Sequence, residues 1–299
     1  MTNYLPKILI TGGNGQLAKA LQHHALAKQF ILQIYSHQLF DITQPQMIEK
    51  IIAREQPDFI INTAAYTAVD KAEYESEQAL FVNYYGAKNL AIACEKYHIP
   101  LLHLSTDYVF DGQQIKAYVE HDPINPLNIY GKSKCLGEKS IREACEQHII
   151  LRVSGVFSEY GNNFVKTILR LAQEKNELRI VADQITCLTY ASDIALVLFK
   201  LIQIKNHWGT YHYCNSDALS WYDFAVNILE IAAPHYHFAV KKIQAITGDE
   251  YISAAKRPRY SVLNCKRIEQ IFHLSQVSWR AGISQTINHL VQHATLSTA

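Results

Sequence analysis

A glycine-rich turn near the start of the chain constrains its fold more than any other feature. It reads Thr11-Gly-Gly-Asn-Gly-Gln-Leu-Ala18 and lies between an apolar run at residues 8–10 and a segment whose apolar residues recur every four positions. A buried strand that turns through glycines into a helix is typical of the unit that binds the pyrophosphate of a dinucleotide. Gly12 and Gly15 allow the backbone to turn tightly and a phosphate group to approach it. Ala18 is small enough for the helix to pack closely on the sheet. An incidental tight turn is the alternative.

Beyond this turn, short apolar runs alternate with segments of helical periodicity. We expect strands at residues 8–10, 30–35, 59–61, 101–104 and 149–151, and helices at about 17–25, 47–52, 76–97 and 128–147. A capping box at Thr43–Gln46 is expected to start the second helix. Strands that are apolar throughout and alternate with helices indicate a parallel sheet covered on both faces. The sequence therefore predicts an α/β fold with a Rossmann-type doubly wound parallel sheet over residues 1–155.

The pattern is less regular after residue 155. We expect helices at 164–175, 192–204 and 221–232, and strands at 179–181 and 210–213. These elements predict a smaller C-terminal α/β lobe over residues 156–299, with some of its elements returning to the main sheet.

Charge and cysteine content narrow the class of protein. The 28 basic and 27 acidic residues give a net charge of +1, so we expect no general binding of nucleic acid or of an anionic membrane. We find no secretory signal and no apolar run near the roughly 20 residues that span a bilayer, and we expect a cytoplasmic protein. The six Cys are scattered, and the 14 His show no metal-ligand spacing, so no metal site is expected.

Tyr130 and Lys134 lie four residues apart, about one helical turn, and should face the same side of a predicted helix. A reductase needs a proton donor for the carbonyl oxygen while hydride reaches the carbon. A nearby ammonium brings the high pKa of a tyrosine towards the working range. The pair alone is common by chance.

A hydroxyl group follows the fourth expected strand. Ser105 and Thr106 come directly after residues 101–104, and ligands of open α/β sheets bind beyond the carboxyl ends of strands. A hydride-transfer site requires three features in a fixed order along the chain: the glycine turn, the hydroxyl at a strand end, and the helix with Tyr130 and Lys134. They occur here in that order. Their combination is far more specific than any one of them.

The end of the second expected strand bears on the choice of cofactor. It reads Tyr35-Ser-His37, with no acid for a ribose 2′-hydroxyl and no arginine for a 2′-phosphate. Because nothing there repels a phosphate, we favour NADPH over NADH.

These features together resemble the extended short-chain dehydrogenase/reductases, and more narrowly the dTDP-4-dehydrorhamnose reductase family. The similarity covers nearly the whole chain, and its Ser-Thr-Asp-Tyr-Val-Phe and late Arg-Pro segments are quite specific to the family. The segments that carry it are Ile10–Leu17, Asp41–Thr43, Pro57–Glu73, Leu104–Gly112, Pro126–Lys134, Gly161–Phe164, Gly209–His212, Ser220–Phe224 and Arg257–Asn264.

The resemblance implies a catalytic triad of Thr106, Tyr130 and Lys134, NADPH or NADH as cofactor, and a dTDP-linked 4-keto-6-deoxyhexose as substrate, bound largely by the C-terminal lobe. Besides Tyr130 and Lys134, the implied cofactor-binding residues are Gly12, Gly15, Gln16, Leu17, Asp41, Ile42, Ala64, Ala65 and Tyr66. The implied substrate-binding residues are Thr67, Val69, Thr106, Asp107, Tyr108, Asn163, Arg257 and Arg259, with the two arginines at the diphosphate. Each of these residues could have a purely structural role instead. Asp41 could form a helix-capping turn, the pocket residues could serve only to pack their loops, and Arg257 and Arg259 could be a solvated pair on the surface.

Two segments depart from the family pattern. Gly155 stands where the family often has a tryptophan near the sugar, and Ile185–Leu188 stands where small residues and a proline are usual. We therefore expect a roomier pocket. Some relatives are dimers that are bridged by Mg²⁺ through a glutamate early in the first helix. The matching residue here is Ala20, so we do not expect this metal bridge. A homodimer without the bridge remains possible.

Three functions are compatible with these observations. The first is NAD(P)H-dependent reduction of the C4 keto group of a dTDP-linked 6-deoxy sugar, for surface polysaccharide such as O-antigen. The second is a related reductase or epimerase that makes a branched or talose-type sugar, for which Gly155 is the reason. The third is a non-catalytic regulatory subunit of the same fold, against which the intact Thr106, Tyr130 and Lys134 argue.

Overall fold

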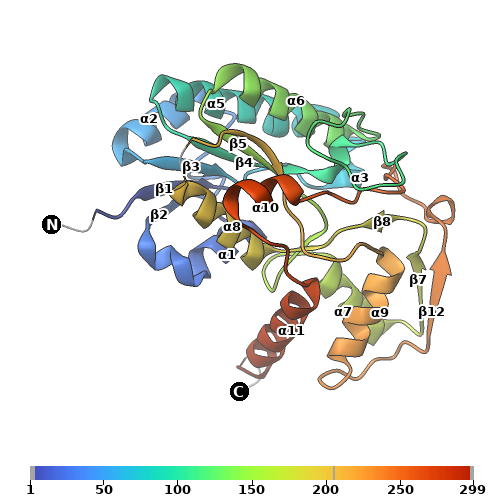
Figure 1. The fold of residues 1–299 in the computed structure, drawn as a ribbon. Coiled ribbons are helices and arrows are strands. Elements are labelled where there is room, and N and C mark those ends of the chain that lie inside the picture. Colours follow the sequence, from blue (N-terminus) through green and yellow to red (C-terminus); the bar gives the residue numbers. More distant parts are fainter. Residues whose placement is uncertain (1–3, 205, 297–299) are drawn as a thin grey trace.

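Six parallel strands form the main sheet of the computed structural model, which describes residues 4–204 and 206–296 (Figure 1). The strand order is β10-β5-β4-β3-β1-β2. The strands are β1 (Lys7–Thr11), β2 (Ile31–Ile34), β3 (Phe59–Asn62), β4 (Leu101–Thr106), β5 (His148–Val153) and β10 (Gly209–His212). The central strands are buried at nearly every position, so both faces of the sheet are covered.

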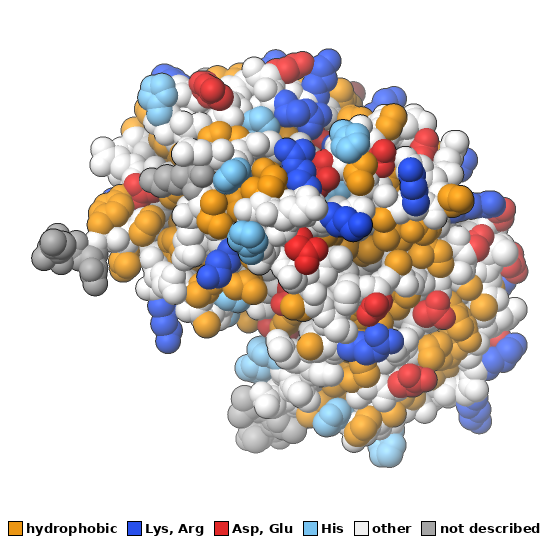
Figure 2. Space-filling model, in the orientation of Figure 1, with side chains coloured by type: hydrophobic (Ala, Val, Ile, Leu, Met, Phe, Trp, Pro, Cys, Tyr) orange, Lys and Arg blue, Asp and Glu red, His pale blue; other side chains and the backbone are white. Residues whose placement is uncertain are grey.

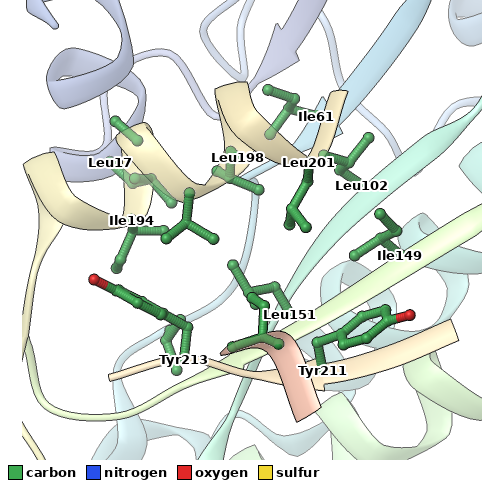
Figure 3. Packing of buried hydrophobic residues seen from close by; sticks show 14 of the residues in the cluster. Leu17, Ile61, Leu102, Ile149, Leu151, Ile194, Leu198, Leu201, Tyr211 and Tyr213 are labelled. Atoms are coloured by element: carbon green, nitrogen blue, oxygen red, sulfur yellow. The ribbon is translucent and has the colours of Figure 1, made fainter. Parts of the chain in front are cut away.

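Helices cover the two faces. On one face, α1 (Gln16–His23) packs beside α8 (Ala191–Gln203), and leucine and isoleucine side chains of both helices meet the sheet (Figure 3). On the other face lie α2 (Pro45–Glu55), α5 (Ala87–Lys96) and α6 (Ile129–Ala144), which pack against each other in that order (Figure 1). The expected α/β fold with a doubly wound parallel sheet is confirmed.

The strand order reverses between β1 and β3. The chain places β2 on one side of β1 and then crosses back, so that β3, β4 and β5 follow on the other side. At such a reversal the loops beyond the strand ends diverge and leave a crevice, where ligands of open α/β sheets bind. The glycine turn leaves β1 directly at this point.

The C-terminal part has a core of its own. Phe157, Phe224 and Trp279 are buried there among aliphatic side chains of α7 (Phe164–Glu174), α9 (Trp221–Ala232) and α11 (Trp279–Leu296). Three short strand pairs accompany these helices: β7 (Glu177–Val181) with β12 (Lys242–Ile246), β6 (Val156–Phe157) with β9 (Thr189–Tyr190), and β8 (Ile185–Thr186) with β11 (Leu219–Ser220). The strand β10 pairs in parallel with β5, although it follows residue 155. The division of the chain at that residue stays a prediction.

Short helices fill the connections. They are α3 (Val69–Ala72), α4 (Ser76–Leu80) and α10 (Lys266–Phe272), the 3₁₀ turns η1 (Ala25–Gln29), η3 (Asp107–Val109) and η4 (Gly248–Glu250), and the π-helical turn η2 (Phe81–Gly86). The helix expected at 76–97 is thus α4, η2 and α5 in succession.

The capping box expected at Thr43–Gln46 is wrong. The helix α2 begins at Pro45 after Gln44, whose side chain makes no cap. Thr43 instead donates its hydroxyl to Asp41 Oδ1 at 2.7 Å, because the aspartate two residues earlier lies within reach of both its hydroxyl and its backbone N–H.

Acidic and basic side chains are interspersed on the face shown in Figure 2, as a net charge of +1 leads one to expect. Within residues 4–204 and 206–296, no helix combines the length and apolar character that crossing a membrane requires.

Candidate active site

The glycine turn holds the backbone of β1 against that of β3. Gly12 has φ +69°, and a Cβ at this position would lie 2.8 Å from the backbone nitrogen of Ala64. Gly13 donates its N–H to Tyr35 O at 2.7 Å, and Gly15 donates to Gly12 O at 2.8 Å. The turn is therefore held by backbone hydrogen bonds and packs closely against the backbone that follows β3. It leaves the N-terminus of α1 facing the crevice.

The start of α1 is suited to a pyrophosphate. Gly15 precedes the helix, and no side chain caps the first turn. These backbone N–H groups carry the positive end of the helix dipole. Leu17 lies in the core, so only its N–H is available to a cofactor. The Gln16 side chain reaches the C-terminal part, where its amide donates to Val156 O at 3.4 Å and accepts from Ser158 at 3.1 Å.

The other expected cofactor positions differ in how much of each residue is exposed. Asp41 accepts from Thr43, and Ile42 is buried beneath the helices of its face, so its side chain packs in the core. Ala64, Ala65 and Tyr66 follow β3 and are partly exposed. Asn83 fixes this last segment by bonding both the N–H and the carbonyl of Tyr66, at 2.9 and 3.0 Å.

Thr106 and Tyr130 come together as expected. Thr106 is the last residue of β4, and Tyr130 lies in the first turn of α6, which Asn128 caps by accepting the Gly131 N–H at 2.8 Å. The hydroxyl of Thr106 accepts the Tyr108 N–H at 3.1 Å and lies near enough to Tyr130 to act on the pKa of its phenol. Burial raises the pKa of Tyr130 to about 12, against the effect of Thr106. The tyrosine therefore holds its proton at neutral pH.

Lys134 lies one turn farther along α6 and is buried. Its ammonium donates to Leu104 O at 2.6 Å, and its Nζ lies 3.2 Å from His103 Nε2. Burial lowers the pKa of Lys134 to about 8, although the Glu138 carboxylate opposes this shift. The residue thus releases its proton more easily than an ordinary lysine does.

A buried carboxyl lies beside the two hydroxyls. Asp107 Oδ1 is 3.1 Å from Thr106 Oγ1. Burial raises the pKa of Asp107 to about 6, while hydrogen bonds from Ser261 and Thr186 lower it. Ser261 and Thr186, which belong to the C-terminal part of the chain, thus lie near this carboxyl.

Tyr108 and Arg257 extend the site away from the sheet. The Tyr108 ring meets that of Tyr130 edge-on, with centroids 5.9 Å apart. Arg257 forms two bonds with Asp70, at 2.7 and 3.2 Å, and lies near Tyr108. Arg259 differs, because its side chain is 72% exposed and reaches only Asp249, at 3.5 Å.

Three expected pocket residues lie at the edges of this group. Thr67 and Val69 lead from β3 into α3 and lie at or near the surface. Asn163 caps α7 by accepting the Lys166 N–H, and its amide donates to Ser158 O at 2.7 Å. The Asn163 side chain therefore holds the loop beside Gln16.

Sequence reasoning missed the buried polar groups behind the site. Glu138 is fully buried and forms an ion pair with Arg152 at 2.6 Å, and it also accepts from Ser105 at 2.6 Å. His103 and Asn62 form a second group behind Lys134. A usable sign was present, since His103 lies inside the apolar run at residues 101–104 and Arg152 directly follows the apolar run at residues 149–151.

The two departures from the family pattern pack against each other. Gly155 has φ +51°, and a Cβ there would lie 2.6 Å from Cys187 O and 3.0 Å from a Leu188 methyl carbon. The expectation of a roomier pocket is therefore wrong at this position. The backbone of Cys187 and the Leu188 side chain occupy the space beside Gly155.

Comparisons with known proteins agree with this geometry. A family model described as RmlD substrate binding domain matches residues 6–292. The dTDP-4-dehydrorhamnose reductase of Aggregatibacter actinomycetemcomitans is 41% identical over 289 residues, 93% of this chain and 97% of that protein. The spore coat polysaccharide biosynthesis protein SpsK of Bacillus subtilis is 37% identical over 266 residues, 89% of this chain and 92% of that protein. The crystal structure of dTDP-4-dehydrorhamnose reductase from Bacillus anthracis in complex with NADP superposes with a TM-score of 0.90 at 36% identity, covering 96% of this chain and 100% of that one.

Proposed function

Because the chain belongs to the RmlD substrate binding domain family, we propose that it is a dTDP-4-dehydrorhamnose reductase that uses NADPH to reduce the C4 keto group of a dTDP-linked 6-deoxy sugar. The observation that carries this proposal is that Thr106 and Tyr130 lie beside each other at the carboxyl end of β4. They supply a proton donor and an orienting hydroxyl beside the crevice where the glycine turn opens.

The residues around the crevice fit NADPH. The uncapped first turn of α1 suits the pyrophosphate, and the close approach of Gly12 to Ala64 leaves no side chain in its way. Ser36 and His37, which follow β2, suit a 2′-phosphate because neither bears a negative charge. When bound, NADPH supplies the hydride for the carbonyl carbon.

The chain's own groups handle the proton and hold the sugar. Tyr130 holds its proton at neutral pH, because burial raises its pKa, and gives that proton to the C4 oxygen as negative charge develops there. Thr106 bonds the same oxygen and orients the carbonyl. Lys134 in its charged form stabilises the phenolate that remains and binds the nicotinamide ribose.

Arg257 and Asp107 are proposed to select the substrate. Arg257 is half-buried beside Tyr108, and its planar guanidinium suits a diphosphate once the bond to Asp70 is exchanged. Asp107 is buried next to Thr106 and suits a sugar hydroxyl. Arg259 is exposed and pairs only with Asp249, so we propose for it at most a contact with the outer end of the diphosphate.

We also infer the setting of the reaction. The product would enter surface polysaccharide such as O-antigen, for which the spore coat polysaccharide relative is the support. We infer a cytoplasmic enzyme, with a homodimer as the candidate assembly.

The experiment is a reduction assay with the purified chain, NADPH and dTDP-4-dehydrorhamnose. We expect loss of NADPH absorbance and an NMR spectrum of dTDP-L-rhamnose. A talose-type or branched product would instead support the related reductase or epimerase, and no NADPH oxidation would support a regulatory subunit.

A further inference from the structure

A chain of buried polar side chains runs behind the catalytic pair, across three neighbouring strands. Thr11 ends β1, Asn62 ends β3 and His103 lies within β4, and each is at most 1% exposed. Thr11 Oγ1 lies 2.6 Å from Asn62 Oδ1, and Asn62 Nδ2 lies 3.0 Å from His103 Nδ1. His103 Nε2 then lies 3.2 Å from Lys134 Nζ. The chain thus joins the strand that precedes the glycine turn to the catalytic lysine.

The backbone sets the direction of these hydrogen bonds. The Ala64 N–H, which can only donate, lies 3.1 Å from Asn62 Oδ1 and identifies that atom as the oxygen. The amide nitrogen of Asn62 therefore donates to His103 Nδ1. Since a neutral imidazole has one proton, it must be on Nε2. That N–H points at Lys134.

An N–H directed at Lys134 favours the amine over the ammonium. A neutral amine accepts this hydrogen bond through its lone pair, whereas an ammonium would face His103 as a second donor. The other partner, Leu104 O, accepts an N–H in either state. Burial acts in the same direction, because it lowers the pKa of Lys134 to about 8 and that of His103 well below its ordinary value.

The remaining charges around Lys134 do not reverse this preference. Glu138, on the same helix, is the carboxylate that favours the ammonium, but it is already paired with Arg152 from β5 and with Arg142 of its own helix. On β5, His148 also acts on His103, and burial lowers its pKa.

We propose that Asn62 and His103 are positioning residues that present a fixed N–H donor to Lys134, so that this lysine loses its proton at a lower pH than it would beside a hydrogen-bond acceptor. The role of Lys134 rests on the proposed function, whereas the direction of the chain does not.

The direction is tested without substrate. A long-range ¹H–¹⁵N correlation spectrum of the protein with ¹⁵N-labelled histidine shows which ring nitrogen carries the proton, and the signals missing from a His103→Leu variant assign the residue. We expect the Nε2–H form in the parent and the Nδ1–H form in Asn62→Asp, whose carboxylate can only accept. An Nδ1–H imidazole in the parent protein would overturn the proposal.

The effect on Lys134 is tested by the pH profile of kcat/KM. Activity falls at high pH as Lys134 loses its proton, and Asn62→Asp should move this limb upward by about one pH unit or more, because His103 then accepts from the ammonium. The new carboxylate also attracts the ammonium directly. We therefore expect a smaller displacement when Asn62→Asp is added to His103→Leu. An equal displacement in both backgrounds contradicts a role for His103.

A matched control is His148→Gln, which removes a buried imidazole at the opposite end of β5. It should leave the limb in place even if it lowers the melting temperature. A failure of the proposed function can be distinguished from a failure of this proposal. In that case the parent protein would oxidise no NADPH with the keto sugar, but it would still give the expected histidine spectrum.

Discussion

A Cβ on Gly12 would lie 2.8 Å from the backbone nitrogen of Ala64, so the turn after β1 and the end of β3 touch with no room for a side chain. Gly12→Ala should therefore both destabilise the protein and weaken NADPH binding. Its φ of +69° alone costs an alanine about 1–3 kcal/mol, and the backbone contact adds to this. Thermal unfolding and NADPH titration check the two effects.

Gly161→Ala is the control for this variant. Gly161 has a similar φ of +60°, but the nearest atom to its Cβ would be 3.5 Å away, on Gln16. We therefore expect Gly161→Ala to lose stability because of its backbone conformation alone, without the steric clash that Gly12→Ala also causes. Equal losses of NADPH affinity in both variants would contradict the role given to the contact with Ala64.

Tyr130→Phe removes the proton donor and little else. The ring keeps its edge-on contact with Tyr108, so the fold and the cofactor crevice should remain. We expect kcat to fall by about 10²–10⁴-fold, the usual contribution of a positioned general acid. The dissociation constant of NADPH, measured by fluorescence, should change little. Turnover close to that of the parent would refute the mechanism.

Ser36→Asp should shift the cofactor preference from NADPH to NADH. Ser36 lies two residues after the end of β2 and is partly exposed. A carboxylate there accepts from the ribose hydroxyls of NADH and repels the 2′-phosphate of NADPH. The ratio of kcat/KM for the two cofactors checks this. Ser36→Asn, similar in size but uncharged, separates charge from bulk, and an equal shift in both variants would argue against repulsion.

Local patterns were enough to predict the parts of the site that lie on one element. The glycine turn, Thr106 at a strand end, and Tyr130 with Lys134 on one helix follow from spacing over a few residues. The parallel sheet follows from apolar runs that alternate with helical periodicity. The glycine turn, the strand-end hydroxyl and the Tyr/Lys pair are each read over fewer residues than a single βαβ unit.

Contacts between distant elements could not be predicted in this way. His103 meets Lys134 across 31 positions and Asn62 across 41, because the strand order brings β3 and β4 together beneath α6. The contact of Gly155 with Cys187 likewise depends on how two loops pack. The failed capping box shows the same limit at short range, since Asp41 competed for the Thr43 hydroxyl.

Buried histidines make the protein sensitive to mild acid. Burial lowers the pKa of His212 to about 3, and its ring is held neutral between Tyr118 O at 3.1 Å and an Arg152 nitrogen at 3.3 Å. An imidazole in the unfolded chain takes up a proton near pH 6.5, about three units sooner than His212 does in the folded protein. Stability should therefore be lost as pH falls from about 6.5 towards 3.

The Glu138 carboxylate adds a second loss at lower pH. Its pairing with Arg152 lowers its pKa to about 2, so its contribution is present above about pH 4.5 and disappears as pH falls towards 2. In Glu138→Gln the buried Arg152 loses its partner, and we expect the free energy of unfolding at pH 7 to fall by about 3–5 kcal/mol. Urea unfolding measures it, and a loss no larger than that of an exposed pair would contradict the burial argument.

The contribution of His212 can be isolated by the slope of stability against pH. One proton taken up on unfolding changes the free energy by about 1.4 kcal/mol per pH unit, and His212→Gln removes one such proton. Between about pH 6 and pH 4, the curve from urea unfolding should flatten by about that amount, whatever the variant's stability at pH 7. His235→Gln, which removes an exposed histidine, is the control for the substitution itself. Curves parallel to that of the parent for both variants would show that His212 is charged in the folded protein, contrary to its contact with Arg152.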